Sequence, residues 1–419
     1  MKRIFISCVC GGLLATSSSV SAFEQLEVNE LVEKTLRQSP RLQAVQSRLR
    51  QQNVEVDIAR DGRWPTLNGY VEQASASESR QQFRVSQKVY DWGTTSGKIE
   101  LAKIEASLIE LEYLHVQEEE AKELIELILD WSSSGNRKEV LQAHLQRLRE
   151  IERLTALRVG NVIDRGELSR VSAAIAGAQI ELTLAESAIG EASDQVQERI
   201  GQPVNLNHLR DLPGFDQWFV DGLSMASLSP LMPLAPPVQD AELGIAKAEP
   251  EKTLATSEWR PTLSVDAIAE RTEDRFGSNT DQRIALRIET PIFQGLAAFR
   301  RPKAAEHALT TAIRQRDREL SNVRRTVQRL TNSIRLQTNR RPLIDRQVQA
   351  SRATMELYTQ QFRIGRRDMS DLIGAEGERL NAELSAIDLK YEQQRLTLRL
   401  SSVLGLLTAK LSGTNGGRS

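Results

Sequence analysis

Residues 81–112, "QQFRVSQKVYDWGTTSGKIELAKIEASLIELE", change their hydrophobic period at Gly93. From Phe83 to Val89, apolar and polar side chains alternate, which is the period of a β-strand. From Leu101 to Leu111, apolar side chains recur at every third or fourth position, which is the period of an α-helix. The sequence therefore predicts a two-sided strand that passes into a long helix at Gly93 without an intervening loop.

The composition favours long helices over one compact core. Of the 419 residues, 40% are hydrophobic, only 5% are aromatic and 26% are charged. This is typical of helices that expose much of their surface to water. The formal net charge of −1 gives no indication of a nucleic acid partner.

The N-terminus has the pattern of a secretory signal peptide. Lys2 and Arg3 precede a short apolar run, and small residues lead up to Ala22. We therefore predict a signal peptide over residues 1–22, with a buried N-terminal helix as the alternative. The two cysteines, Cys8 and Cys10, lie within it, so the mature chain is expected to contain no disulfide. No later segment reaches the length and apolar character of a transmembrane helix.

The chain contains two copies of one unit. "SPRLQAVQSRLRQQNVEVDIARDGRWPTLNGY" (39–70) parallels "APPVQDAELGIAKAEPEKTLATSEWRPTLSVD" (235–266), and "VYDWG" parallels "PIFQG" (291–295). Gly201 similarly matches Gly405. Each copy reads as a helix, two strands, a long helix, a sharp turn and a second long helix. We predict a first repeat over 23–211, a Pro- and Gly-rich linker over 212–237, a second repeat over 238–411 and a disordered tail over 412–419.

Four strands are predicted, at about Thr66–Gln73, Gln82–Trp92, Thr262–Arg271 and Arg283–Phe293. Their alternation over about ten residues suits a membrane barrel, and it suits a half-buried soluble sheet equally well. Four strands are too few to close a barrel of useful width. In the membrane interpretation, three or more chains must share one barrel, because an open sheet edge cannot face lipid.

The predicted helices are too long for a compact domain. No proline interrupts the chain from Thr94 to about Arg158, although "SSSGN" (132–136) is a soft spot. Roughly 64 residues at 1.5 Å each give about 95 Å. The following helix carries a strict heptad, formed by Val171, Ile175, Ala178, Leu182, Ala185, Ile189, Ala192 and Val196. The heptad predicts coiled-coil packing. A soluble rod would explain the helices alone, but not the strands, the signal and the duplication together.

Charge is distributed unevenly between the copies. Residues 110–126 hold seven glutamates, whereas residues 300–341 hold eleven arginines. We hypothesise that these acidic and basic helices alternate around the assembly and select correct neighbours. The alternative is two solvated faces, because exposed ion pairs contribute only about 0–1 kcal/mol each.

The sequence does not predict an enzyme. Its histidines are scattered, without metal-ligand spacing, and isolated surface positions account for all of them: His115, His144, His208 and His307. The sequence shows no phosphate-binding loop and no cofactor fingerprint. We therefore predict no catalytic residue, no bound metal and no cofactor.

The duplication, the two strand–helix joints and "FRIGRRDMSDLIGAEGERLNAELSAIDLKYEQQRLTLRLSSVLGLL" (362–407) resemble the TolC-like outer membrane factors, the outer membrane efflux protein family. The resemblance covers nearly all of the mature chain. It implies an α+β membrane protein with four transmembrane strands per chain. A homotrimer would then form a twelve-stranded barrel in the lipid of the outer membrane, continued by a coiled-coil tunnel in the periplasm.

The resemblance also implies a function. Members of this family are exit ducts of Gram-negative cells that act with a periplasmic adaptor and an inner-membrane transporter. "RVSQKVYDWGTTSGKI" and "DRGELSRVSAAIAGAQIEL" are most similar to members that serve type I secretion, including export of large adhesins, which implies an ABC-type transporter. Small-molecule or drug efflux is the alternative. A periplasmic adaptor or coiled-coil scaffold is the alternative from another class.

Finally, the resemblance assigns the channel entrance to the turns at Gly160 and Gly365. Asp371 takes the place of an acidic ring residue, while the second ring aspartate is replaced by Gly374 and Asp368 lies one turn earlier. Arg367 and Glu167 match a pair that locks the closed state, and Asp164 belongs to the same entrance. Solvated turn charges are the simpler interpretation. Gly93 and Gly295 mark the strand–helix joints, and Pro250 predicts a kink in the helix before the third strand.

Overall fold

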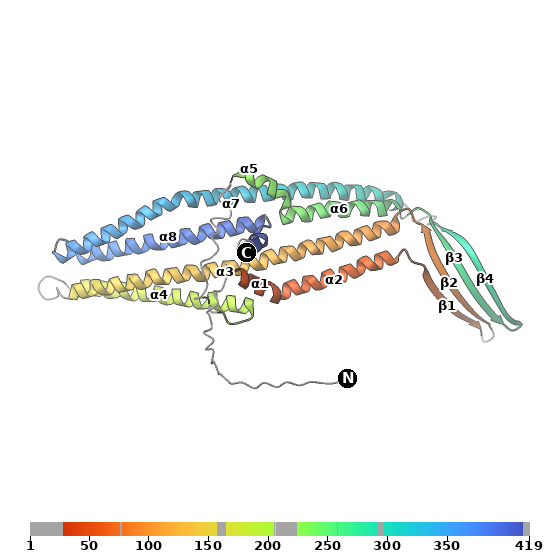
Figure 1. Cartoon of the computed structure of the whole chain (residues 1–419), viewed down its shortest axis with the longest axis horizontal. Helices are drawn as coiled ribbons and strands as arrows, with labels where there is room; N and C mark the ends of the chain where they lie inside the picture. The colour runs from red at the N-terminus through yellow and green to blue at the C-terminus, as the bar shows by residue number, and fades with distance from the viewer. Residues whose placement is uncertain are drawn as a thin grey trace, which may run out of the picture.

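The computed structural model describes residues 28–75, 78–156, 165–204, 206, 224–257, 259–290 and 297–413. The molecule is elongated, with its helices along the long axis and one sheet at one end (Figure 1). The first repeat comprises α1 (Val28–Gln38), α2 (Pro40–Asp61), β1 (Thr66–Ser75), β2 (Glu78–Tyr90), α3 (Thr94–Ala156) and α4 (Arg165–Ile200). The second comprises α5 (Met225–Leu228), η3 (Ser229–Leu234), α6 (Pro236–Ser257), β3 (Thr262–Asp274), β4 (Gly277–Glu289), α7 (Ala297–Arg363), α8 (Met369–Val403) and α9 (Leu407–Gly413).

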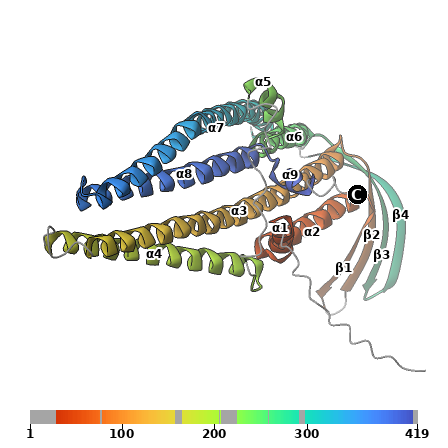
Figure 2. The ribbon, with the colours of Figure 1, turned by 60° about the vertical axis from the view of Figure 1, so that its left-hand side comes forward.

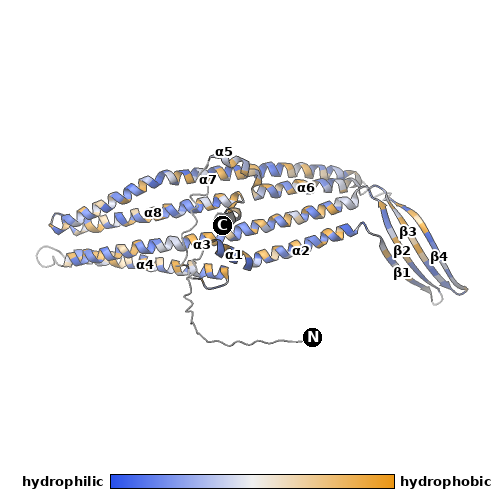
Figure 3. Ribbon diagram, in the orientation of Figure 1, coloured by the Kyte–Doolittle hydropathy of each residue, from blue (hydrophilic) through white to orange (hydrophobic). Residues whose placement is uncertain are grey.

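The four strands form one antiparallel sheet in the order β1-β2-β3-β4. The alternation predicted from the sequence is confirmed, because Leu67, Val85, Ala267 and Ile284 lie in one row across the sheet. Leu67, Val85 and Ile284 are 69%, 40% and 81% exposed. Figure 3 shows hydrophobic and hydrophilic residues interleaved along the strands. The sheet thus presents an uncovered apolar face.

Several strand ends differ from the prediction. β2 ends at Tyr90, not at Trp92, because Trp92 has a φ of 56° and leaves the extended conformation. β4 begins at Gly277 and ends at Glu289, so it lies several residues earlier in the chain than predicted. The hairpins therefore reach further from the helices than the sequence pattern indicated.

The helices form one curved layer whose order follows from their contacts. α3 runs the full length of the layer, with α2 and α4 on one side of it and α6 and α8 on the other. α7 then packs against α6 and α8 on their far side. Figures 1 and 2 show this order from two directions. α7 is one edge of the layer, and α2 with α4 is the other.

The predicted heptad on α4 is confirmed. Val171, Ala178, Ala192 and Val196 are buried, and the remaining heptad residues are half-buried, while most intervening residues are exposed. Towards the helix tips, Val171 and Ala178 pack with Leu148, Met369 and other residues of α3, α7 and α8. This apolar cluster joins the α3–α4 hairpin to the α7–α8 hairpin.

The soft spot predicted at residues 132–136 is wrong, because α3 is helical throughout. Ser133 is buried, and Asn136 donates a hydrogen bond from Nδ2 to the Tyr391 hydroxyl at 2.7 Å. The small polar residues that suggested a break are therefore part of the contact between α3 and α8.

Part of the predicted linker is helical. Within 212–237, α5 and η3 occupy 225–234, and Leu228 and Met232 pack against Val327 and Leu400. α6 starts at Pro236 and continues through Pro250, where we predicted a kink. α9 extends to Gly413, into the predicted tail. The signal peptide and residues 414–419 lie outside the described residues.

The duplication predicted from the sequence is visible in the fold. Gly201 ends α4 and Gly405 follows α8, and both have a φ of 67°. Each half contributes two strands and one long helical hairpin. Among the described residues, no helix combines the length and the apolar character that a membrane span needs.

Candidate functional site

The joint between β2 and α3 is fixed by Asp91. Gly93 has a φ of 86°, a conformation that glycine adopts at little steric cost. The Asp91 carboxylate accepts hydrogen bonds from the backbone N–H groups of Gly93 (3.2 Å) and Thr95 (2.8 Å). Trp92 donates from Nε1 to the Pro261 carbonyl at 2.9 Å, which ties this joint to the second repeat. The predicted role of Gly93 as a strand–helix joint fits this geometry, while Gly295 lies outside the described residues.

Asp91→Ala is expected to destabilise the chain by about 1 kcal/mol, because it removes the acceptor at the start of α3. Asp91→Asn keeps one acceptor oxygen and is expected to lose less. Partial burial by itself raises the pKa of Asp91, but the hydrogen bonds from Thr95 and Gly93 outweigh it and hold the pKa below its usual value. The stabilisation is therefore complete above the unfolded pKa of about 3.9 and is lost as the pH falls through the lower folded pKa. Urea unfolding at pH 7 and pH 3 checks this: a destabilisation by Asp91→Ala that is equally large at both pH values would contradict it.

The turn between α7 and α8 forms one tip of the molecule. Gly365, with a φ of 81°, donates its N–H to the Phe362 carbonyl at 3.0 Å, and the Arg366 N–H reaches the Gln361 carbonyl at 2.9 Å. These bonds close the last turn of α7 and reverse the chain. The predicted role of Gly365 in a sharp reversal is consistent with this turn.

Arg367 is held within this turn. It donates from Nη1 to Asp371 at 3.1 Å and from Nε to Gln361 at 3.1 Å, and its guanidinium lies 4.2 Å from the centre of the Tyr358 ring. The hydrogen bond to Asp371 raises the pKa of Arg367 above its ordinary value, so the side chain stays charged. Arg367 and Asp371, both singled out from the sequence, are thus direct partners.

The other predicted entrance residues are less fully placed. Asp368 is exposed and precedes the first residue of α8, and Glu167 lies half-buried in the first turn of α4. Gly160 and Asp164 lie outside the described residues. The contacts of Arg367 given above are all within its own hairpin, so its pairing with Glu167 stays a prediction.

A buried charge network joins the α3–α4 hairpin to the α7–α8 hairpin between the tip and the sheet. It was not predicted from the sequence. The Glu376 side chain is fully buried, with 0% exposure, and it faces His144 Nδ1 at 2.7 Å, Arg147 Nε at 2.8 Å and Arg379 Nε at 2.9 Å. Arg379 continues to Glu383 at 2.9 Å, and Glu383 accepts from Arg352 of α7 at 2.8 Å. The network therefore connects α3, α8 and α7.

His144 corrects the sequence interpretation. We expected all four histidines to be isolated at the surface, but His144 is buried against Glu376, while His115 and His307 are exposed and His208 lies outside the described residues. The available signal was the spacing of Glu376, Arg379 and Glu383, which lie on one face of a helix.

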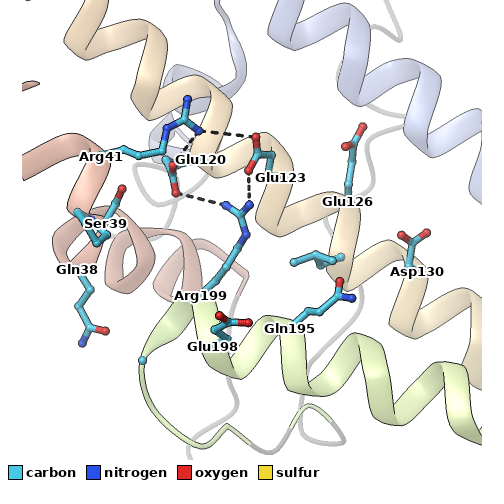
Figure 4. A pocket seen from close by; sticks show the side chains of 13 residues that line it. Gln38, Ser39, Arg41, Glu120, Glu123, Glu126, Asp130, Gln195, Glu198 and Arg199 are labelled. Atoms are coloured by element: carbon cyan, nitrogen blue, oxygen red, sulfur yellow. Dashed lines mark hydrogen bonds and ion pairs between the residues drawn. The ribbon is translucent and has the colours of Figure 1, made fainter. Parts of the chain in front are cut away.

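A second charge cluster lies midway along the molecule, beside an open cavity of about 740 Å³ (Figure 4). Arg41 contacts Glu119 at 2.7 Å and Glu120 at 3.2 Å. Arg199 contacts Glu120 at 3.3 Å and also pairs with Glu123. These contacts join α2, α3 and α4 at the point along α3 where its neighbour changes from α2 to α4.

This cluster corrects our hypothesis on helix charges. Six of the seven glutamates in 110–126 are engaged within the chain, by Arg41, Arg48, Arg199 and Arg399 or by the N-terminus of α9: Glu112, Glu118, Glu119, Glu120, Glu123 and Glu126. α3 also has helices on both sides. It is therefore not an edge that the basic helix α7 of a second chain could reach, and the hypothesis is wrong in its choice of acidic helix.

The face of the sheet opposite the apolar row is polar. Asp266 is fully buried there and accepts from the Ser86 hydroxyl at 2.7 Å and from Arg287 Nε at 2.5 Å. Within the described ranges, no group of three His, Cys, Asp or Glu residues is placed to hold a metal ion. The sheet thus separates a polar face from an apolar one, and the helices continue from its end.

Comparison with known proteins gives consistent results. The family model for "Outer membrane efflux protein" matches residues 31–202 and 233–406, one range in each repeat. The chain resembles the outer-membrane channel OprN with a TM-score of 0.79 and 18% identity, over 90% of this chain and 89% of that one. It resembles VceC from Vibrio cholerae with a TM-score of 0.76 and 17% identity, over 90% and 96%. For the Campylobacter jejuni CmeC outer membrane channel the TM-score is 0.74 and the identity 15%, over 93% and 89%. The comparison with curated protein sequences gave no significant match.

Proposed function

The chain belongs to the outer membrane efflux protein family, and from this premise we propose that three copies form the exit duct of a tripartite export system. The chain is an outer membrane channel component and not an enzyme. The observation that carries the proposal is the exposed apolar row of Leu67, Val85 and Ile284, on a sheet at the end of 63- and 67-residue helices. Twelve strands from three chains would close a barrel in lipid, and the helices would form the periplasmic tunnel.

The partners follow from the same proposal. A periplasmic adaptor would join the helix tips to an inner-membrane transporter, which supplies the energy. The adaptor or scaffold alternative fits poorly, because an adaptor would carry a single helical hairpin flanked by small β domains. This chain has two hairpins, α3–α4 and α7–α8, and a sheet with one face uncovered.

We propose a large secreted protein, such as an adhesin, as the cargo, exported through an ABC-type transporter. The support is the similarity of the strand–helix joint around Gly93 and of the start of α4 to type I secretion members. Export of small molecules is the second candidate, favoured by the family's description as efflux proteins.

Comparing the released and cell-surface proteins of the parent strain with those of a strain lacking this gene tests the cargo. We expect one large protein to disappear from the surface or the medium, and reintroducing the gene should restore it. An unchanged protein profile together with increased sensitivity to drugs and dyes would favour efflux and contradict the secretion proposal.

At the tip, we propose that Arg367 holds the channel closed, with Glu167 as its partner in a neighbouring chain and with Asp164, Asp368 and Asp371 around the opening. Arg367→Ala would remove its contacts with Asp371 and Tyr358. Losing about 1 kcal/mol of closed-state stabilisation would raise the open population about five-fold. Conductance in planar bilayers should rise accordingly.

The matched control is Arg366→Ala, which removes an exposed arginine next to it. Glu167→Gln separates a lock between chains from a local role in the turn, because it should also raise the conductance only if the lock exists. Unchanged conductance in Arg367→Ala would contradict the gating role.

A further inference from the structure

The two edge helices carry unpartnered apolar heptads. On α4, Ile180 and Leu184 are 63% and 64% exposed and lie opposite the buried heptad, in line with Ala173 and Gly177. On α7, Leu336, Leu343 and Leu357 are 58%, 55% and 50% exposed, and they share a seven-residue spacing with Ala350. Two apolar seams are thus open to solvent in the single chain, one at each edge of the helical layer.

Nearer the sheet than these apolar residues, the two edges carry opposite charge: α4 is acidic and α7 is basic. α4 exposes Glu191, Asp194 and Glu198, and α7 exposes Arg329, Arg335 and Arg340. Within the part of the chain that the structure describes, none of these six side chains forms an ion pair. Glu191 accepts a hydrogen bond from Gln195 and Arg340 donates one to Gln337, each within its own helix and at 3.3 Å, so the charges of the six side chains are not neutralised by these contacts.

Contacts across the layer show which residues of the two edges lie at one height along the axis. Glu186 of α4 pairs with Lys138 of α3 at 3.1 Å, and the adjacent Arg137 pairs with Asp388 of α8 at 2.5 Å. Five residues further along α8, Gln393 contacts Thr338 of α7 at 3.5 Å. Because α7 runs antiparallel to α8, Glu186 lies at about the height of Leu343.

Rotation about the long axis keeps the height of every residue, so in a cyclic assembly edges meet at equal height. Counting from Glu186 and Leu343, Ile180 meets the region of Ala350, and Ala173 meets that of Leu357. In the other direction, Glu191, Asp194 and Glu198 meet the region of Arg340, Arg335 and Arg329. In this antiparallel register Ala173 and Ile180 meet Leu357 and Ala350, the acids meet arginines, and Leu336 lies among the charged residues at about the height of Asp194.

Where α4 of one copy packs antiparallel against α7 of the next copy in the trimeric duct, we propose that the three acids of α4 and the three arginines of α7 select this register. This interface rests on the proposed trimeric duct and names the residues that close its helical ring. Ala173 and Gly177 leave room for Leu357, as small residues do opposite a knob in a coiled coil.

The contact inside the chain explains how the charges give specificity. Because the chain is duplicated, the α3–α8 contact within one copy is equivalent to the α7–α4 contact between copies. Within the chain, the acids Glu126 and Asp130 of α3 pair with Arg399 and Arg395 of α8. Between copies the order is reversed, with arginines on α7 and acids on α4. If the two contacts exchanged partners, so that these positions of α3 met those of α4 and those of α7 met those of α8, acids would face acids and arginines would face arginines.

Cysteine cross-linking tests the register, because Cys8 and Cys10 are the only cysteines of the sequence and lie in the predicted signal peptide. The test chain carries Ile180→Cys and Ala350→Cys. The control carries Ile180→Cys and Leu336→Cys, which shifts the α7 position by two heptads, or about 21 Å. After mild oxidation of outer membranes, we expect disulfide-linked dimers and trimers for the first pair only.

Charge reversal tests the selection. In the cross-linking background, Asp194→Arg with Glu198→Arg, or Arg329→Glu with Arg335→Glu, should each lower the linked fraction at least several-fold. All four changes together should restore it. Native trimers in the outer membrane without cross-links, cross-links of equal yield in the shifted control, or no restoration would overturn the interface and leave the proposed duct intact. A chain that is neither trimeric nor in the outer membrane would overturn the duct itself.

Discussion

Glu376→Ala is expected to lower the free energy of unfolding by about 3–5 kcal/mol, because it leaves the buried guanidinium of Arg379 and the neighbouring side chains without their shared hydrogen-bond acceptor. Glu376 faces His144, Arg147 and Arg379, and its side chain has no exposed surface. Removing one partner of such a network is far more costly than removing an exposed ion pair. Urea unfolding of the purified protein, followed by circular dichroism, measures the change.

Glu378→Ala is the matched control, since Glu378 lies two residues away on the same helix and is exposed. It should change the stability by less than about 0.5 kcal/mol. Equal effects of the two substitutions would show that the network does not hold the hairpins together.

Phe83→Arg should prevent stable insertion of the sheet, at a cost of about 2–4 kcal/mol if the site lies near the bilayer midplane. Phe83 lies on the apolar face of the interior strand β2 and is 57% exposed in the single chain. Gln82→Arg is the control at nearly the same depth, because Gln82 lies on the opposite face, across from Glu270. The amount of folded protein in outer membranes reports the difference. Similar losses for both variants would contradict the assignment of the faces.

The regular parts of the fold could be predicted because each depends on a local period. The heptad from Val171 to Val196 and the alternation in β2 are visible in the sequence, and the structure confirms both. Strand ends were less predictable, because the end of β2 depends on the positive φ of Trp92 and on the cap that Asp91 provides.

Long-range contacts explain what the sequence could not provide. His144 and Glu376 lie far apart in the chain, and no local pattern shows that α3 and α8 bring them together. The glutamates of residues 110–126 are a second example, because the arginines that pair with them lie on α2, α4 and α8. Whether a helix lies at an edge depends on the complete layer, so the sequence could not show that α3 has helices on both sides. The charge hypothesis was wrong for this reason.

The tethering of α3 to α8 has a consequence for how each contact can be built. Two helices of one polypeptide meet at a high effective concentration, whereas helices of separate chains must first find each other by diffusion. The contact between α3 and α8 can therefore depend on the fully buried Glu376, whose desolvation demands a complete set of partners. A surface that is exposed to water before assembly is more stable when it consists of leucines, alanines and exposed charges, which α4 and α7 carry. The tethered contact can therefore bury its charges, whereas the exposed surfaces of α4 and α7 are built to tolerate water.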